Sequence, residues 1–182
     1  MTDMEFSELI ESRRSIRDYK KSAAISSEDI EKMVYAAQQA PSWKNSQTGR
    51  YYAVISEKNI ALVQNECLPG FNSERTKNVL AYIITTFKKG ISGFGVDGNP
   101  TDTIGNGWGA YDLGLQNENL ILKARELGYD TLIMGLKNNA VIRKEFGIPD
   151  DEEIMSVIAV GKRNVEPTKP QRKDIFEVLK LF

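Results

Sequence analysis

Along this chain, segments whose hydrophobic residues have helical spacing are followed by segments whose hydrophobic residues have the spacing of strands. A stripe of apolar residues follows Ser26-Ser27-Glu28-Asp29, which is typical of a helix start, and Pro41 ends the helix. A longer stripe predicts a helix from Trp108 to Leu127, ended by Gly128. Shorter helices are expected at about 4–13, from Ser56 to a break at Pro69-Gly70, and from a cap at Asn139 to Phe146.

Four apolar runs predict strands. They are Tyr51–Ile55, Val79–Phe87, Tyr129–Met134 and Met155–Val160. The acidic run at 150–153 is interpreted as the opening of a helical turn, where acids stabilise the helix dipole. Residues 88–107 are rich in Gly and Asn and predict a long irregular loop, which could serve as a mobile lid or a binding loop.

Length and composition limit the possible classes of protein. A chain of 182 residues with 41% hydrophobic content predicts one domain over 1–182. A net charge of −1 gives no general attraction to nucleic acid or to an acidic membrane, and the apolar run at 79–87 is too short to span a bilayer. With one cysteine and no signal-peptide pattern, we expect a cytoplasmic protein without a disulfide.

Histidine is absent from the chain, and Cys67 is its one cysteine. This excludes a Ser-His-Asp or Cys-His nucleophile and a zinc site with histidine ligands, and we expect no metal. If the chain is an enzyme, much of its chemistry must come from a cofactor, or from carboxylates, lysine or tyrosine.

The run Arg13-Arg14-Ser15-Ile16-Arg17 places three guanidinium groups and a hydroxyl where the first helix should end. Guanidinium groups match phosphate oxygens in a bidentate manner, so the run is a candidate anion site. Two alternatives are a solvated basic patch and an RNA-binding segment over 13–21. Neutral overall charge and the lack of interleaved aromatic residues count against RNA.

The loop Pro41-Ser42-Trp43-Lys44-Asn45-Ser46-Gln47 gathers amide, hydroxyl, aromatic and ammonium groups after a helix stop. Such a mixture suits a planar heteroaromatic ligand, although a polar turn with Trp43 in the core would have the same sequence. The run from Gly93 to Gly98 matches the dinucleotide pattern G-x-G-x-x-G. We interpret that match as coincidental, because Asn99-Pro100 prolongs the loop where a helix should begin.

The last residues, 162–182, are first polar and then apolar, with Phe176, Leu179 and Phe182 near the end. The sequence shows no partner element for these side chains. They should bury in a groove of their own domain or on a second subunit, and we favour the second subunit.

Four motifs in order resemble the FMN-dependent nitroreductase family. They are Arg-Arg-Ser-Ile-Arg at 13–17, Pro-Ser-x-x-Asn-Ser-Gln at 41–47, Gly-Trp-Gly-Ala-Tyr-Asp at 107–112, and Leu-Gly-Tyr-Asp at 127–130 leading to Met134-Gly135. The resemblance covers nearly the whole chain. It implies an α+β fold with a mixed, mainly antiparallel sheet flanked by helices, and an interlocked homodimer with noncovalent FMN at its interface.

The resemblance also implies a set of cofactor-binding residues. Arg13 and Ser15 would bind the FMN phosphate with help from Arg14, and Arg17 would lie near the N1 and C2 carbonyl edge of the flavin. Asn45 would bind the pyrimidine edge, and Gly135 would bring a backbone amide near N5 or O4. The remaining implied residues are Pro41, Ser42, Trp43 and Gln47, expected from the partner subunit, with Met134 beside Gly135, and Lys169 and Arg172 in the tail.

The reaction implied is ping-pong hydride transfer from NADH or NADPH to a small electron-poor acceptor, such as a nitroaromatic or a quinone. Flavin N5 would carry the hydride, so no side chain is expected to act as a catalytic acid or base. The alternatives are a dehalogenating or flavin-consuming enzyme on the same scaffold, and a non-catalytic FMN-binding or storage protein.

Five residues depart from the family pattern. Thr48-Gly49 stands where many relatives have Pro-Trp, and Met134 stands where some have Glu. Trp43 and Lys44 are bulkier than is usual and could narrow the acceptor pocket. The chain is also too short for the helical insertion of larger members, so we expect the loop at 88–107 to replace it as a lid.

Overall fold

The computed structural model describes residues 5–182. Its helices are α1 (Phe6–Ser12), α2 (Ser27–Gln38), α3 (Glu57–Leu62), α4 (Gly70–Arg75), α5 (Gly107–Glu126), α6 (Asn139–Phe146) and α7 (Ile175–Val178), with short turns η1 (Trp43–Asn45) and η2 (Val63–Cys67). Its strands are β1 (Tyr19–Lys20), β2 (Gly49–Val54), β3 (Ala81–Lys88), β4 (Asp130–Met134) and β5 (Glu152–Arg163). No helix among these residues is long and apolar enough to cross a membrane.

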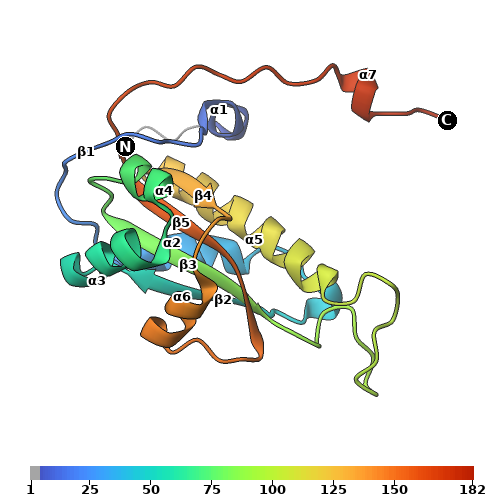
Figure 1. Cartoon of the computed structure of the whole chain (residues 1–182). Coiled ribbons are helices and arrows are strands. Elements are labelled where there is room, and N and C mark those ends of the chain that lie inside the picture. The colour runs from blue at the N-terminus through green and yellow to red at the C-terminus, as the bar shows by residue number, and fades with distance from the viewer. Residues whose placement is uncertain (1–4) are drawn as a thin grey trace.

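The strands form one sheet in the order β1-β5-β3-β2, with β4 also paired to β5 (Figure 1). Each strand pairing within the described residues is antiparallel. A single parallel bridge, between Ser15 and Thr131, adds the segment after α1 to β4. The expected α+β fold with a mainly antiparallel sheet and flanking helices is therefore confirmed.

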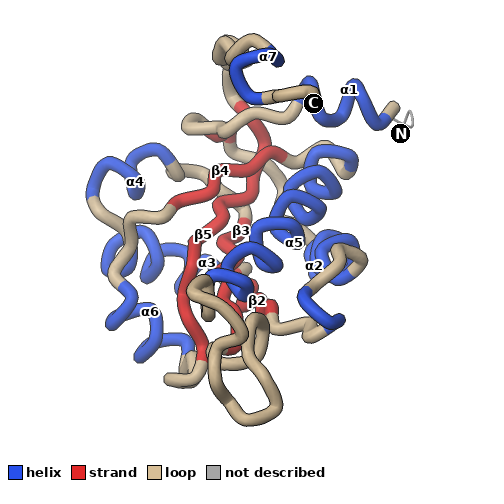
Figure 2. Tube along the Cα trace, turned by 90° about the vertical axis from the view of Figure 1, so that its right-hand side faces the viewer, coloured by secondary structure: helices blue, strands red, loops and turns tan. Residues whose placement is uncertain are grey.

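Helices cover both faces of the sheet (Figure 2). Tyr82 and Ile84 of β3 face a core shared with η2 and α6, whereas Ala81 and Ile83 face the core under α2 and α5. This alternation follows from the two-residue period of a strand. Because β3 is buried on both faces, its sequence is almost continuously apolar and threonine-rich.

Most predicted boundaries are correct to within a few residues. Ser26 caps α2 by accepting a hydrogen bond from the Asp29 nitrogen at 3.1 Å, and Gly147 ends α6 in the left-handed conformation with φ 62°. The cap of α6 is Asn138 and not Asn139. Pro69-Gly70 does end the preceding helical segment, but the sequence reading missed α4, which starts there.

The interpretation of the acidic run at 150–153 was wrong. Glu152 and Glu153 are the first residues of β5, and Glu152 is buried. Its carboxylate accepts hydrogen bonds from the Tyr52 hydroxyl at 2.9 Å and the Thr86 hydroxyl at 2.5 Å. Two hydroxyl partners, one from β2 and one from β3, therefore allow an acid to enter the sheet, and no pattern along the chain signals those partners.

The long loop at 88–107 is irregular, as predicted, and projects from the end of the sheet (Figure 2). Gly93 and Gly98 have positive φ angles of 83° and 76°, and an isolated bridge joins Phe94 to Pro100. Gly93, Gly95 and Gly98 thus belong to a turn within the loop. The dinucleotide interpretation is excluded, because α5 begins only at Gly107.

Candidate functional site

The arginine run is fixed to the edge of β4. The Ile16 nitrogen donates a hydrogen bond to the Thr131 carbonyl at 2.9 Å, and the Ile16 side chain is 2% exposed. Ile16 therefore acts as an apolar anchor between polar neighbours. The residues around it, Arg13, Arg14, Ser15 and Arg17, remain at or near the surface.

A buried ion-pair cluster of Asp130, Arg125 and Arg163 packs against the residue that precedes the arginine run. Asp130 accepts bidentate hydrogen bonds from Arg163, at 2.5 Å from Nη2 and 3.0 Å from Nε, and a further one from Arg125 at 3.3 Å. Arg163 also donates to the Ser12 carbonyl at 3.5 Å, and Arg125 donates to the Ser12 hydroxyl at 3.3 Å. The hydrogen bonds with Asp130 raise the pKa of Arg163. This cluster fixes the chain one residue before Arg13.

The guanidinium groups of the run have few partners of their own. Arg14 donates to the Arg13 carbonyl at 2.5 Å, and Arg17 donates to the Ser15 carbonyl at 3.2 Å. Arg13 has an acidic neighbour, Glu118, but its Nε lies 3.9 Å from that carboxylate. Most of the guanidinium N–H groups therefore remain available, and such a donor set suits a phosphate.

The tail begins beside this cluster. Lys169 lies 3.6 Å from Glu11, the residue two positions before Arg13. Arg172 is exposed further along the tail. The structure thus brings Lys169 near the arginine run. It places Arg172 in solvent.

The strand β4 leads from Thr131 to the other predicted contact, Met134-Gly135. Met134 is buried, whereas Gly135 is exposed, and a Cβ built at Gly135 would meet no atom within 4 Å. Open space therefore lies where a ligand could approach the backbone. At about 3.3 Å per residue, Gly135 lies about 13 Å along the strand from the Ser15–Thr131 bridge.

Lys137, which the sequence reading missed, stabilises the turn after Gly135. Its Nζ donates to the carbonyls of Gly135 at 3.3 Å and of Met155 at 3.1 Å. Met155 is the bulged residue of β5, skipped between the pairs of Thr85 and Thr86, so its carbonyl needs a partner outside the ladder. Burial lowers the pKa of Lys137. Asn72 also donates to the Leu136 carbonyl at 3.2 Å.

The polar loop at 41–47 adopts a constrained conformation. Lys44, Asn45 and Gln47 have positive φ angles of 46°, 55° and 49°, which are uncommon outside glycine. The Ser42 hydroxyl accepts a hydrogen bond from the Gln47 nitrogen at 3.0 Å and so closes the loop. Trp43 is partly buried, and Asn45 and Gln47 are exposed. The amide side chains are thus accessible.

Lys44 stacks on the Trp43 ring at 4.4 Å from its centroid, so these two bulky side chains form one unit. A small cavity of about 220 Å³ lies next to them. It is lined by Pro41, Ser42, Trp43, Trp108, Tyr111, Asp112 and Leu115. The rings of Trp108 and Tyr111 meet nearly at right angles, with centroids 5.9 Å apart.

The structure separates the predicted residues into two groups. Arg13 approaches α5 at Glu118, whereas the Trp43 nitrogen binds α5 at Asp112. Glu118 and Asp112 are six residues apart, which is about 9 Å along the helix axis. They point about 120° apart around that axis, so they lie on different faces of the helix. Figures 1 and 2 show α1 and the tail at one end of α5 and the loop at 88–107 at the other. Within one chain the two groups therefore contact different faces of α5.

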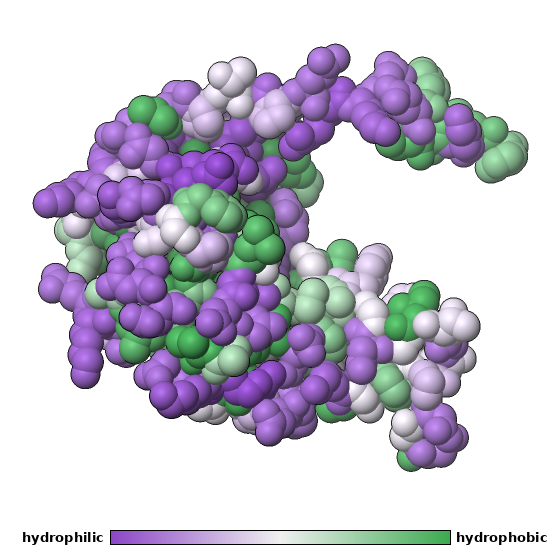
Figure 3. All heavy atoms as spheres, in the orientation of Figure 1, coloured by the Kyte–Doolittle hydropathy of each residue, from purple (hydrophilic) through white to green (hydrophobic). Residues whose placement is uncertain are grey.

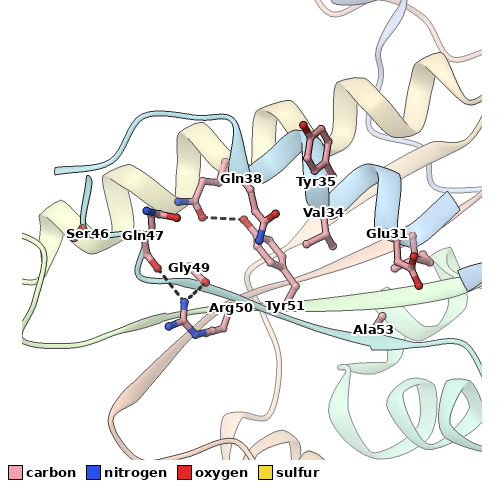
Figure 4. A pocket seen from close by; sticks show the side chains of 12 residues that line it. Glu31, Val34, Tyr35, Gln38, Ser46, Gln47, Gly49, Arg50, Tyr51 and Ala53 are labelled. Carbon is pink, nitrogen blue, oxygen red and sulfur yellow. Dashed lines mark hydrogen bonds between the residues drawn. The ribbon is translucent and has the colours of Figure 1, made fainter. Parts of the chain in front are cut away.

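A larger cavity of about 1020 Å³ lies between α2, β2 and α5 (Figure 4). Tyr51 donates to Gln116 at 2.9 Å on its floor, and Arg50 donates to the carbonyls of Gln47 and Gly49 at 2.9 and 2.7 Å. Of the predicted site residues, Gln47 alone lines it. The arginine run and Gly135 are not part of this cavity.

The signals for the missed residues were weak. Asp112 and Asp130 occur within the quoted motifs, but a single acid in a helix or at a strand start is usually exposed. Lys137 has no distinguishing neighbour in sequence.

Comparisons with known proteins identify the family and the fold. The family model described as the Nitroreductase family matches residues 10–162. A protein of Archaeoglobus fulgidus, named as an NADH dehydrogenase/NAD(P)H nitroreductase, is 29% identical over 157 residues, which are 84% of this chain and 82% of that protein.

Solved structures show the same fold. A nitroreductase from Exiguobacterium sibiricum, in complex with FMN, has a TM-score of 0.87 at 23% identity and covers 100% of this chain and 99% of its own. An NAD(P)H:FMN oxidoreductase from Staphylococcus epidermidis has a TM-score of 0.82 at 21% identity, with 100% and 98% covered. Since the family model matches most of the chain, this protein belongs to the Nitroreductase family.

Proposed function

We propose that this protein is an FMN-dependent oxidoreductase that uses NADH or NADPH to reduce an electron-poor acceptor, such as a nitroaromatic or a quinone. One observation carries the proposal. The arginine run is fixed to the edge of the same strand, β4, that ends at the open backbone of Gly135. Family membership supports it, as do the relatives named for NAD(P)H and the solved neighbour that contains FMN.

Bound FMN supplies hydride transfer between the nicotinamide and the acceptor. Arg13 and Ser15 hold its phosphate with Arg14, and Lys169 and Arg172 of the tail complete this site. The support is the donor set itself, because the guanidinium groups have few protein acceptors within reach. Their bidentate geometry and fixed charge suit a dianion.

Arg17 acts at the redox end of the cofactor. Its cation stabilises the negative charge that reduction brings to the ring, and this favours hydride uptake. Met134 and Gly135 provide the backbone surface near N5 and O4. The absence of a Cβ at Gly135 allows this close approach. Lys137 binds the Gly135 carbonyl and so fixes the orientation of the backbone at this position.

Two copies of the chain form the site. Pro41, Ser42, Trp43, Asn45 and Gln47 of one copy complete the site that the arginine run of the other begins. The separation of these groups on α5 supports this division. Asn45 then binds the pyrimidine edge, and the loop at 88–107 covers the acceptor. Each copy is one FMN-binding domain over 1–182.

The tail supports an interlocked homodimer. Figure 3 shows it extending from the body, with hydrophobic side chains gathered at its far end. Phe176 is 66% exposed and Leu181 is 79% exposed within one chain. Large apolar side chains at such exposure favour a partner surface, and we assign that surface to the second copy.

Anaerobic mixing with NADH or NADPH tests the activity. We expect the absorbance of bound FMN to bleach with one of these donors and to return when a nitroaromatic or a quinone is added. Bleaching without reoxidation by any acceptor in a broad panel would favour a storage protein. No bleaching with either donor would contradict the proposal.

Mixed dimers test the shared site. In a dimer of one Arg13→Ala chain and one Asn45→Ala chain, a shared site leaves one of the two sites intact. We expect about half of the FMN sites of the wild type, whereas the two variant homodimers bind FMN poorly. Equally poor binding by the mixed dimer would show that both residues act in the same chain.

A further inference from the structure

Asp112 is a buried carboxylate without a nearby cation. It is 2% exposed, and no ion pair joins it to any lysine or arginine of residues 5–182. Its two oxygens accept hydrogen bonds from the Trp43 nitrogen at 3.1 and 3.0 Å. One of them also accepts a bond from the Ser92 hydroxyl at 2.8 Å. A buried charge is unfavourable unless such donors compensate it, so these contacts are strong constraints on both partners.

The first partner, Trp43, precedes the left-handed residues of the polar loop. Non-glycine residues in this conformation are strained, and Lys44, Asn45 and Gln47 all adopt it. The bond from the Trp43 nitrogen to Asp112 fixes one side of this stretch. The bond from the Gln47 nitrogen to the Ser42 hydroxyl closes the other side.

The second partner, Ser92, belongs to the long loop at 88–107 and is 1% exposed. Its hydroxyl lies 2.6 Å from the Ser46 hydroxyl and 3.4 Å from the Thr48 hydroxyl. Asp112 and Ser92 thus connect the two loops through one chain of hydrogen bonds. Chains of this kind strengthen each member in a buried setting.

We propose that Asp112 is a positioning residue for the flavin. It holds the loop at 41–47 in the strained conformation that turns Asn45 toward the flavin. Through Ser92 it also holds the loop at 88–107 against the loop at 41–47. This inference rests on the proposed FMN site. Asp112 itself does not touch the cofactor, because its oxygens are buried and occupied by Trp43 and Ser92.

The test compares Asp112→Ala, Asp112→Asn and Ser92→Ala with Glu152→Gln. Glu152 is a matched control, since it is another buried carboxylate that accepts hydrogen bonds from hydroxyl groups, outside the site. We expect Asp112→Ala to raise the Kd for FMN by about tenfold or more and to shift the absorbance band of the bound flavin. Asn keeps an acceptor for the Trp43 nitrogen, and its amide N–H can donate to the Ser92 hydroxyl, which donates to the carboxylate in the wild type, so Asn should restore most of the affinity.

A second readout needs no cofactor. Lys44 lies in the loop and is exposed, so trypsin cleavage after Lys44 reports the order of that loop. Asp112→Ala should speed this cleavage, while cleavage after Lys58 stays as in the wild type. Ser92→Ala, which leaves the Trp43 contact in place, covers the case in which Asp112→Ala does not fold and should give a smaller change in the same direction.

Two results would overturn the inference. One is an FMN affinity and flavin spectrum of Asp112→Ala that match those of Glu152→Gln. The other is unchanged cleavage after Lys44. Failure of the wild type to bind FMN would instead reject the proposed function, and faster cleavage after Lys44 in Asp112→Ala would still show that Asp112 orders the loop.

Discussion

The backbone nitrogen of Ile16 donates a hydrogen bond to the carbonyl of Thr131, 2.9 Å away. This hydrogen bond joins two segments that are far apart in sequence. We predict that one of them binds the phosphate of FMN and that the other lies against the flavin ring. The arginine run lies on one side of the hydrogen bond, and β4 continues to Gly135 on the other. Because this hydrogen bond fixes the two segments next to each other, substitutions in either segment can test the role we assign to it.

Arg13 and Arg17 should differ in their effects. Arg13→Ala removes a phosphate donor, so we expect FMN affinity to fall by about tenfold or more, since a hydrogen bond from a charged group contributes about 1.5–3 kcal/mol. Arg17→Ala should retain much of its FMN but accept hydride more slowly. Equilibrium titration with FMN and stopped-flow reduction measure the two effects, and equal changes in both variants would contradict this division.

Asp130 should stabilise both the fold and the site. Asp130→Ala leaves Arg125 without its carboxylate and Arg163 with the exposed Glu166 alone, which we expect to cost about 3 kcal/mol of unfolding free energy. Urea unfolding measures this cost. A loss below about 1 kcal/mol, typical of an exposed ion pair, would show that the cluster does not support the arginine run.

Gly135 should matter to the ligand and not to the fold. Since a Cβ there meets no atom, Gly135→Val should change the unfolding free energy of the apoprotein by no more than about 0.5 kcal/mol. The added side chain fills the space we assign to the flavin, so FMN affinity should fall. Gly70→Val is the control, because a Cβ at Gly70 also meets nothing within 4 Å. Equal FMN affinity in the two variants would place the flavin elsewhere.

Stability should decline at alkaline pH. Burial raises the pKa of the Cys67 thiol from 9.0 to about 11, so the folded state holds this proton more tightly than the unfolded state does. The contribution is complete below pH 9 and is lost as the pH rises through 11. Burial also raises the pKa values of Tyr52 and Tyr129 to about 12, which acts in the same direction. Urea unfolding at several pH values checks this, with Cys67→Ala expected to show a shallower decline, and a free energy independent of pH up to 11 would refute it.

Local sequence signals predicted most of the fold, because caps, breakers and periodicity act over a few residues. Ser26, Pro41 and Gly147 marked their helix ends correctly. The failure at Glu152 has a different origin, since its burial depends on Tyr52 and Thr86, which lie on other strands. Long-range partners of this kind have no local signature.

The candidate site could be predicted in part for the same reason. The arginine run and the polar loop stand out as unusual local clusters, and the family resemblance gave them roles. Their placement on different faces of α5 could not be read from sequence, because it depends on how Arg13 meets Glu118 and how Trp43 meets Asp112. The buried carboxylates in contact with these clusters, Asp130 and Asp112, could be recognised only from the structure.

The measurement that tests the account most directly is the visible spectrum of the purified protein, followed by titration of any apoprotein with FMN. We expect a yellow protein that releases free FMN on denaturation and that binds one FMN per chain. A colourless protein that also fails to bind added FMN would contradict the central claim.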